Sequence, residues 1–394
     1  MIAEARLQAG GPLFCFAGGG TGGHLYPALA VADAIRALVP DARFLFFRTG
    51  RRVDNHILDR SGYESAPQAL APVTYRPWRW PRMLGSLRVA LRDCRGRFLQ
   101  DRPVCVIGTG GLASIPAVLQ GVRMGIPTGI LNPDALPGRA NRYLARKVDA
   151  VFAQWEVTGT HLSRGNVVVT GCPVRPEFHS VDRAAGVVRF GLDSKRRTLL
   201  ITGASQGARS INDAILRLAA FLSGVGGWQI LHLAGDQDFE RVRATYSANA
   251  VSAIVISYTD HMAEALAAAD LIVSRAGAST LAELTALGRA SILLPYPYHK
   301  DQHQLANAEC LARRGAAVVV RDRVEADANA PALLRELKRL MLDDGARGTM
   351  AGAAAAMGRP LAAGDIAEAV LRMSQTQHRF AGFERVKRAL AGTR

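Results

Sequence analysis

The amino-acid sequence predicts an α/β protein with two doubly wound domains, each a parallel sheet with helices on both faces. Three observations support this prediction. The chain has 394 residues, which suits two domains of about 150–200 residues each. It is 49% hydrophobic and 21% charged, so it can bury a large core and is not a disordered chain. Short apolar runs alternate with helical segments along the chain, in two successive series.

The first series occupies the N-terminal half. Its apolar runs are short and rich in Val, Ile and Phe, as expected for buried strands. Strands are expected at 13–17, 43–47, 104–108, 128–132 and 150–154, and helices at 27–38, 114–124 and 138–147. Proline is favoured in the first turn of a helix, which supports a helix that begins at Pro27.

The second series begins near residue 198. Strands are expected at 198–203, 228–235, 253–258, 270–277, 291–297 and 316–320, and helices at 210–222, 262–269, 279–287 and 304–313. The stretch Pro173–Arg197, rich in charge and proline, is expected to join the two domains. In open parallel sheets ligands bind outside the carboxyl ends of the strands, so the loops there are the candidates for function.

Charge and cysteine content bound the partners and the compartment. Lysine and arginine number 49 against 33 acidic residues, a net charge of +16 that favours nucleic acid, an anionic membrane or a phosphorylated substrate. Five scattered cysteines without a C-x-x-C pair argue against a disulfide framework or a zinc site and favour a reducing compartment. The N-terminus is unlike a secretory signal, and no run approaches the length of a membrane span. We expect a protein that is soluble or lies on a membrane surface.

A glycine-rich loop, Gly18-Gly-Gly-Thr-Gly-Gly-His24, follows the first strand. It matches G-x-G-x-x-G, in which backbone N–H groups approach an anion at a helix N-terminus. A dinucleotide site would also need an acid at the end of the next strand, yet the first acid there is Asp54. A glycine turn without a ligand is the other alternative. His24 is either a structural histidine or a general base, since an ordinary imidazole pKa of about 6.5 suits proton transfer.

Four further loops carry polar groups at strand ends. Gly108–Pro116 is a glycine-rich platform for an anion or a sugar, and Gly203–Arg209 offers backbone and side-chain donors at a helix start that suit a diphosphate. Tyr298–Gln304 concentrates groups that bind sugar hydroxyls. Glu283, on the first turns of the helix after Ser274-Arg-Ala-Gly, can accept both hydroxyls of a ribose or only pair with the helix dipole. Asp236-Gln-Asp238 resembles a metal–nucleotide pair, but a helix cap is the simpler interpretation.

Together these motifs resemble those of the MurG family, glycosyltransferases that attach N-acetylglucosamine to the membrane-bound muramyl-pentapeptide precursor of bacterial cell walls. The resemblance runs from about Leu13 to about Arg372 and rests on GGGTGGH, GTGGLASIPA, PGRANRYLA, TGCPVR, GASQGARSIN, SRAGASTLAE and HKDQHQLANA. It implies two Rossmann-like domains of the GT-B type with an interdomain cleft. It also implies an inverting enzyme of peptidoglycan synthesis, in which the C4 hydroxyl of the lipid-linked acceptor attacks the donor and UDP leaves.

The resemblance assigns roles to individual residues. Positions that contact UDP-N-acetylglucosamine in the family are matched by Thr21, Gly22, Gly23, Arg175, Ser205, Glu283 and Gln304. It implies that Ser205 meets the diphosphate, Glu283 the ribose and Gln304 the sugar hydroxyls. No metal or other cofactor is expected, because helix N-termini and loop N–H groups can stabilise the leaving diphosphate.

Two departures from the family pattern bear on the acceptor side. Asn132-Pro133-Asp134 stands where the family usually has Glu-Gln-Asn, so Asp134 replaces an amide expected to touch substrate. Cys172 replaces a usual Asn and Ala276 a usual Ser. Candidates for the catalytic base are therefore His24 and its rival Asp134, which could also act as a pair.

The resemblance also orders the domains. Residues 1–176 are expected to bind the undecaprenyl-pyrophosphoryl acceptor and the membrane, and residues 177–360 the UDP-sugar. Residues 361–394 are expected to form a helix that packs back on the N-terminal domain, followed by a basic tail. Arg76–Arg92 mixes Trp, Leu and Arg as an interfacial segment does, although an ordinary amphipathic surface helix explains it equally well. This places the protein peripherally on the cytoplasmic face of the bacterial membrane, on anionic lipid.

Three alternatives stay open. A related GT-B transferase could act on another lipid or a small-molecule acceptor. A nucleotide-sugar-binding scaffold would lack turnover, although the intact glycine loop argues against it. Nucleic acid is the partner that charge alone would favour, but no recognised motif supports it, and we expect none.

Overall fold

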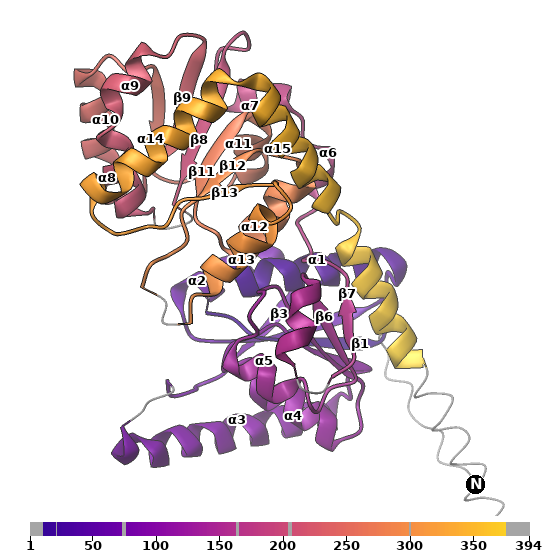
Figure 1. The fold of residues 1–394 in the computed structure, drawn as a ribbon. Coiled ribbons are helices and arrows are strands. Elements are labelled where there is room, and N and C mark those ends of the chain that lie inside the picture. Colours follow the sequence, from indigo (N-terminus) through magenta and orange to yellow (C-terminus); the bar gives the residue numbers. More distant parts are fainter. Residues whose placement is uncertain are drawn as a thin grey trace, which may run out of the picture. The chain divides into compact units, whose positions relative to one another are not determined.

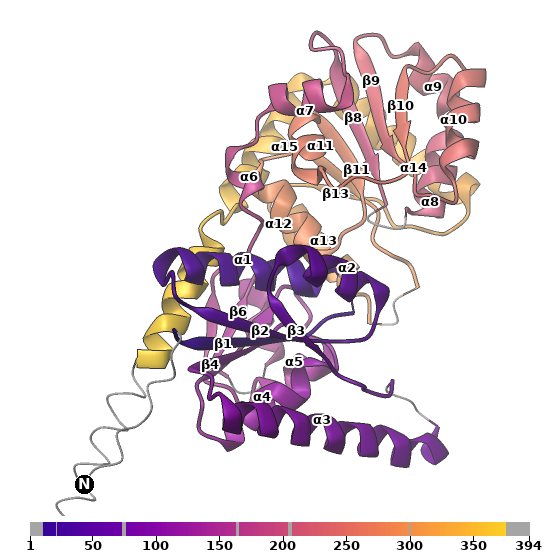
Figure 2. The same cartoon turned by 180° about the vertical axis from the view of Figure 1, so that it is seen from behind.

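The structure is a computed structural model that describes residues 11–20, 22–72, 76–162, 165–203, 207–298 and 301–375 (Figure 1, Figure 2). The chain divides into two compact units. The first contains the described residues up to Pro133, Pro137–Pro173 and those from Leu361 on. The second contains Asp134–Leu136 and Val174–Pro360.

The first unit is built on a parallel sheet, which has seven strands among the described residues, in the order β3-β2-β1-β4-β5-β6-β7. The strands are β1 (Leu13–Ala17), β2 (Arg43–Arg48), β3 (Glu64–Pro67), β4 (Cys105–Gly108), β5 (Thr128–Asn132), β6 (Ala150–Ala153) and β7 (Val167–Val169). Every residue of β1 and β4 is buried, because helices cover both faces of the sheet. Phe16 of β1 stacks on Phe46 of β2 within this core.

Helices surround this sheet. They are α1 (Gly22–Leu38), α2 (Arg52–Ser61), α3 (Trp80–Gln100), α4 (Ser114–Arg123) and α5 (Arg139–Leu144), with short 3-10 turns η1 (Pro77–Arg79) and η2 (Glu156–His161). Residues 362–375 are also helical and belong to this unit. Ile366, Ala367 and Val370 of that helix are fully buried in the core formed by β1, β2 and α1.

The second unit repeats the plan, with six parallel strands in the part of the chain that is described, in the order β10-β9-β8-β11-β12-β13. Its strands are β8 (Arg197–Thr202), β9 (Trp228–Leu233), β10 (Ala253–Ile256), β11 (Leu271–Ser274), β12 (Ser291–Leu293) and β13 (Val318–Val319). Its helices are α6 (Glu177–Ser180), α7 (Arg183–Phe190), α8 (Arg209–Leu216), α9 (Ala219–Gly224), α10 (Phe239–Ala248), α11 (Met262–Ala268), α12 (Ala278–Ala286), α13 (His303–Ala312), α14 (Ala326–Leu342) and α15 (Asp344–Met357).

The strand order of each sheet fixes where a ligand can bind. In the first unit the order reverses between β1 and β4, and in the second between β8 and β11. The helices that follow the two strands at such a point pack on opposite faces of the sheet, and a crevice therefore forms at the carboxyl ends of these strands. The prediction of two doubly wound, Rossmann-like α/β units is confirmed, and the crevices are the places to look for function.

Several predicted elements differ in detail. The edge strands β3 and β7 were not predicted, because an edge position leaves much of each strand exposed and weakens its apolar pattern. The helix expected to begin at Pro27 begins at Gly22, since a proline near a helix N-terminus removes only one intrahelical bond. The helix expected at 210–222 is divided into α8 and α9.

Candidate functional site

Two glycine-rich loops meet at the switch point of the first unit. One runs from β1 to α1 and contains Gly18, Gly19 and Gly20, and the other runs from β4 to α4 and contains Gly110 and Gly111. A Cβ on Gly111 would lie 3.4 Å from the carbonyl oxygen of Gly19. A Cβ on Gly18 would lie only 1.9 Å from the Thr109 hydroxyl oxygen and 3.1 Å from the carbonyl oxygen of Gly110, so the two loops pass so closely that Gly18 has no room for a side chain.

Asp54 of α2 fills the inner side of the first loop. Its buried carboxylate accepts the N–H of Gly20 at 2.7 Å (Oδ1) and the N–H of Thr49 at 3.1 Å (Oδ2), as well as the Thr49 hydroxyl. A Cβ on Gly19 would collide with this carboxylate, and the φ of +135° at Gly19 also favours glycine. An internal acid therefore binds an N–H that a dinucleotide site would offer to pyrophosphate. This arrangement weighs against the dinucleotide alternative.

His24 lies on the first turn of α1, between the two loops. Its Nδ1 is 2.9 Å from the carbonyl oxygen of Gly19, and the side chain is half-buried. Because a carbonyl oxygen only accepts hydrogen bonds, Nδ1 carries the hydrogen, and in the neutral ring Nε2 is the free acceptor. A Cβ on Gly110 would lie 3.0 Å from Nε2, so glycine at this position leaves room in front of that nitrogen. The geometry suits a base that takes a proton on Nε2.

The other residues predicted in this loop are placed only in part. Gly22 and Gly23 form the first residues of α1, next to His24. A Cβ on Gly22 would lie 3.0 Å from the ring of Tyr26. Thr21 lies outside the described residues.

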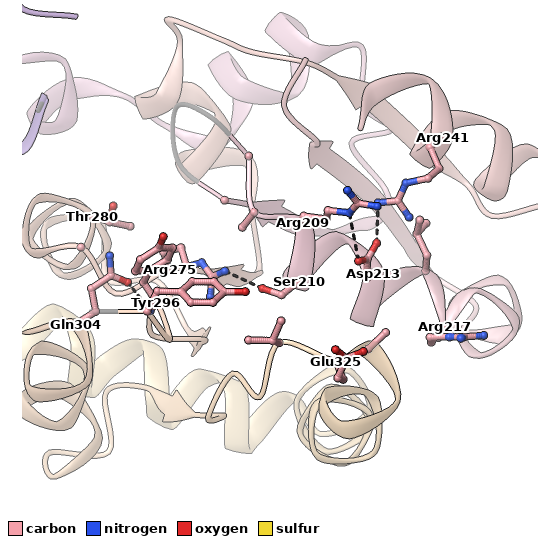
Figure 3. Close-up of a pocket in the computed structure, with 18 of the residues that line it drawn as sticks. Arg209, Ser210, Asp213, Arg217, Arg241, Arg275, Thr280, Tyr296, Gln304 and Glu325 are labelled. Carbon is pink, nitrogen blue, oxygen red and sulfur yellow. Dashed lines mark hydrogen bonds and ion pairs between the residues drawn. The ribbon is translucent and has the colours of Figure 1, made fainter. Parts of the chain in front are cut away.

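A pocket of about 880 Å³ opens at the switch point of the second unit (Figure 3). It is lined by the end of β8 (Gly203), the start of α8 (Ser210), the turn after β11 (Gly277) and the segment after β12 (Tyr296). This is the position at which the predicted platform Gly203–Arg209 was expected to bind a diphosphate. Ser205 itself lies outside the described residues.

A buried ion pair fixes one wall of this pocket. Arg275 donates to Asp322 at 2.6 Å and to the Ser210 hydroxyl at 2.8 Å (Figure 3 shows the contact with Ser210). Burial alone would raise the pKa of Asp322, but hydrogen bonds from Ser210, Arg275 and Asn329 hold it below its usual range. The guanidinium is therefore neutralised by the protein and braces the loops after β11 and β12. Sequence reasoning missed this network, because its members are far apart in the chain.

Gln304, at the start of α13, also lines the pocket. Its side-chain oxygen accepts the N–H groups of Tyr296 at 2.9 Å and of Ala276 at 3.2 Å. An amide has one oxygen and one NH₂ group. The oxygen thus holds the loops after β12 and β11, and the NH₂ group is the part of Gln304 that suits a sugar hydroxyl.

Glu283 is not among the residues that line this pocket and instead faces Arg175. One of its oxygens lies 3.9 Å from the Arg175 guanidinium, which also pairs with Glu177 at 3.0 Å. Burial raises the pKa of Glu283 to about 7, with Arg175 opposing the shift and Glu177 adding to it. The side chain is 15% exposed and lies beyond the first turn of α12, so pairing with the helix dipole explains it poorly. A nearly buried acid with a raised pKa, facing a guanidinium, is typical of a binding site.

Asp134 groups with the second unit, whereas His24 belongs to the first. Asn307 of α13, fully buried, donates to the Asp134 carboxylate at 2.8 Å and accepts the N–H of Ala135 at 2.8 Å. His303 donates from Nδ1 to the carbonyl of Leu136. Asn307, which sequence reasoning did not select, therefore holds the segment in which this chain departs from the family pattern.

The acidic pair Asp236 and Asp238 has a structural role in part. Asp238 stands at the N-cap position of α10 but makes no capping hydrogen bond, so the expected cap is wrong. Its carboxylate accepts Arg241 and Asn212, each at 2.8 Å. Within the described ranges, no three His, Cys, Asp or Glu side chains are grouped as metal ligands. The helices of the same ranges include none with the length and apolar character that crossing a bilayer requires.

Two family models match the chain. The glycosyltransferase family 28 N-terminal domain matches residues 14–153 and the C-terminal domain of the same family matches residues 198–366. A curated relative from Desulforamulus reducens, a UDP-N-acetylglucosamine–N-acetylmuramyl-(pentapeptide) pyrophosphoryl-undecaprenol N-acetylglucosamine transferase, is 35% identical over 91% of this chain and 98% of its own. The protein of the same name from Thermodesulfovibrio yellowstonii is 34% identical over 90% and 98%.

Solved structures have the same architecture. MurG from Acinetobacter baumannii matches with a TM-score of 0.72 at 26% identity, over 92% of this chain and 100% of that chain. A UDP-GlcNAc 2-epimerase from Neisseria meningitidis, bound to UDP-GlcNAc, matches with a TM-score of 0.62 at 15% identity, over 91% and 98%. The second similarity concerns the fold alone.

Proposed function

Since the chain belongs to the MurG family of glycosyltransferases, within glycosyltransferase family 28, we propose that it makes lipid II from lipid I in peptidoglycan synthesis. It transfers N-acetylglucosamine from UDP-N-acetylglucosamine to the C4 hydroxyl of the muramyl-pentapeptide that pyrophosphate links to undecaprenol. The hydroxyl oxygen forms a bond with the anomeric carbon, the bond from that carbon to the diphosphate oxygen breaks, and UDP leaves. The configuration at the anomeric carbon inverts.

One observation carries the proposal at the level of chemistry: the placement of His24. Its Nδ1 donates a hydrogen bond to the carbonyl oxygen of Gly19, so Nε2 can accept the proton of the attacking hydroxyl. Asp134 has the smaller role of positioning the acceptor, because its carboxylate is held by Asn307. The acceptor binds at the glycine loops of the first unit.

The donor binds mainly to the second unit. Glu283 accepts the ribose hydroxyls beside Arg175, and Gln304 offers its NH₂ group to the sugar. Ser205 and the N-terminus of α8 meet the diphosphate, which supports departure of UDP without a metal. The family resemblance also assigns Thr21, Gly22 and Gly23 to donor binding.

The protein lies on the cytoplasmic face of the membrane, docked through the start of α3. Trp78 is 73% exposed and Trp80 49% exposed, and the first turns of α3 project beyond the rest of the first unit in both views (Figure 1, Figure 2). Only the second half of the helix, at Ala90, Cys94 and Phe98, is buried in the unit. Arginines flank the exposed tryptophans, with the Arg76 guanidinium 5.9 Å from the Trp78 ring. Indole rings with adjacent guanidinium groups suit the interface of an anionic bilayer.

A transferase with a different lipid or small-molecule acceptor is the second candidate, and one observation favours it. Asp134, in Asn132-Pro133-Asp134, brings a carboxylate to a position where the family usually has an amide. A carboxylate accepts hydrogen bonds but cannot donate them, so it would select a different pattern of acceptor groups. A panel of lipid-linked and soluble sugar acceptors distinguishes the two candidates.

The test of the main proposal is transfer from radiolabelled UDP-N-acetylglucosamine to a short-chain lipid I analogue, with and without EDTA. His24→Ala lowers kcat by about 10²–10⁴-fold, the usual worth of acid–base catalysis, with little change in donor affinity. Asp134→Asn costs less than about tenfold. His56→Ala, which removes an exposed histidine of α2, is the matched control. If Asp134→Asn abolishes turnover and His24→Ala spares it, the roles are reversed.

A further inference from the structure

One peptide group connects a buried acid to His24. The carbonyl oxygen of Gly19 accepts His24 Nδ1 at 2.9 Å, and the N–H of Gly20 donates to Asp54 Oδ1 at 2.7 Å and Oδ2 at 3.0 Å. These two backbone groups belong to the same planar amide, the bond between Gly19 and Gly20. The chain of contacts therefore runs from carboxylate to amide to imidazole within the first unit.

The arrangement is fixed from both sides. Asp54 is fully buried, and its Oδ2 also accepts Thr49 N–H at 3.1 Å and the Thr49 hydroxyl. Arg51 donates to the carbonyl of Gly20 at 3.1 Å, so the next peptide group is held as well. A carboxylate on the N–H of an amide polarises that amide and makes its carbonyl a stronger acceptor.

We propose that Asp54 is a positioning residue for His24, acting through the Gly19–Gly20 peptide to hold the imidazole as the Nδ1–H tautomer with Nε2 free. This inference rests on the proposed role of His24 as the base. In a serine protease a buried acid does the same for the catalytic histidine by direct contact. Here the amide is inserted between the two side chains, so the acid fixes the ring without contacting it.

The substitution Asp54→Asn tests this proposal, because it keeps the shape and removes the charge. The NH₂ group of the new asparagine would then face the backbone N–H of either Gly20 or Thr49. Both of these groups are donors, so they cannot form a hydrogen bond with each other. Asp59→Asn is the matched control, since Asp59 lies on the same helix and is exposed. Full-length proteins are compared by ¹⁵N spectra of the histidine rings, with His24→Gln identifying the His24 signals, and by kcat and KM for UDP-N-acetylglucosamine.

In the wild-type protein at pH 8, the His24 signals are expected to show a protonated Nδ1 and a bare Nε2. Asp54→Asn populates the other tautomer and lowers kcat by about 10–100-fold, less than removal of the base itself, while KM for the donor stays within about twofold. A merely structural role of Asp54 would not move the ring signals.

Either of two results overturns the proposal: a wild-type His24 that carries its hydrogen on Nε2, or ring signals and kcat in Asp54→Asn that match Asp59→Asn. If Asp54→Asn fails to fold, Asp54→Glu, which keeps the charge but displaces the carboxylate from the Gly20 N–H, is compared with Asp59→Glu by the same ring signals and kcat. A failure of the proposed role of His24 as the base can be distinguished from these results. In that case His24→Gln would retain a normal kcat, whatever the tautomer of the wild-type ring.

Discussion

Donor affinity should depend on pH through Glu283. Burial raises the pKa of this acid to about 7, whereas accepting two ribose hydroxyls requires the ionised form. With that pKa the ionised fraction is about 0.1 at pH 6 and about 0.9 at pH 8. Because the apparent Kd is the intrinsic value divided by the competent fraction, the Kd for UDP-N-acetylglucosamine should fall about tenfold over this range, about 1.4 kcal/mol.

Calorimetric titration of UDP-N-acetylglucosamine at pH 6, 7 and 8 measures this effect. The sugar nucleotide is the suitable ligand, since a terminal phosphate such as that of UDP titrates near pH 6 itself. Glu283→Gln should bind more weakly at pH 8, by about 1–3 kcal/mol for ribose hydroxyls left without their acceptor, and should show no pH dependence. Glu240→Gln, an exposed acid of α10, is the control. A wild-type Kd that does not change between pH 6 and 8 would refute the reasoning.

Three further results are expected. Gly110→Ala should lower kcat at least about tenfold, because the φ of +111° at Gly110 disfavours a side chain and the new Cβ would lie 3.0 Å from His24 Nε2. The control Gly125→Ala also has a positive φ, but its Cβ would point into open space, so this variant should retain activity. Burial lowers the pKa of His232 to about 3, so as pH falls from about 6.5 the unfolded chain takes up a proton that the native state refuses. Below that pH, urea unfolding should show that the free energy of unfolding falls by up to about 1.4 kcal/mol per pH unit. In His232→Gln this dependence on pH should be weaker. The double variant Trp78→Ala, Trp80→Ala should sediment less with anionic liposomes than the wild-type protein does. The wild-type protein should also bind anionic liposomes better than neutral liposomes at high salt, and equal binding to both would contradict an electrostatic contribution.

The fold followed from the sequence because its strands are buried on both faces and read as continuous apolar runs. Edge strands such as β3 escaped this test, since burial there is partial. The glycine loops and Glu283 could also be predicted, because each belongs to a short sequence motif that directly follows a predicted strand. The parts that could not be predicted are contacts between distant residues: Asp54 with Gly20, Asn307 with Asp134, and Arg275 with Asp322. No local spacing encodes such pairs.

The helix at 362–375 has a consequence for how the protein is made. Ile366, Ala367 and Val370 complete the core of the unit that contains the N-terminal strands, yet the ribosome adds them after the entire second unit. The nascent first unit therefore has an apolar face uncovered while the second unit is synthesised, whereas the second unit has all of its parts when residue 360 emerges. A stop codon near residue 361 would consequently spare the later-made unit and leave the earlier-made one incomplete. The first unit is begun before the second but obtains its last core residues after it.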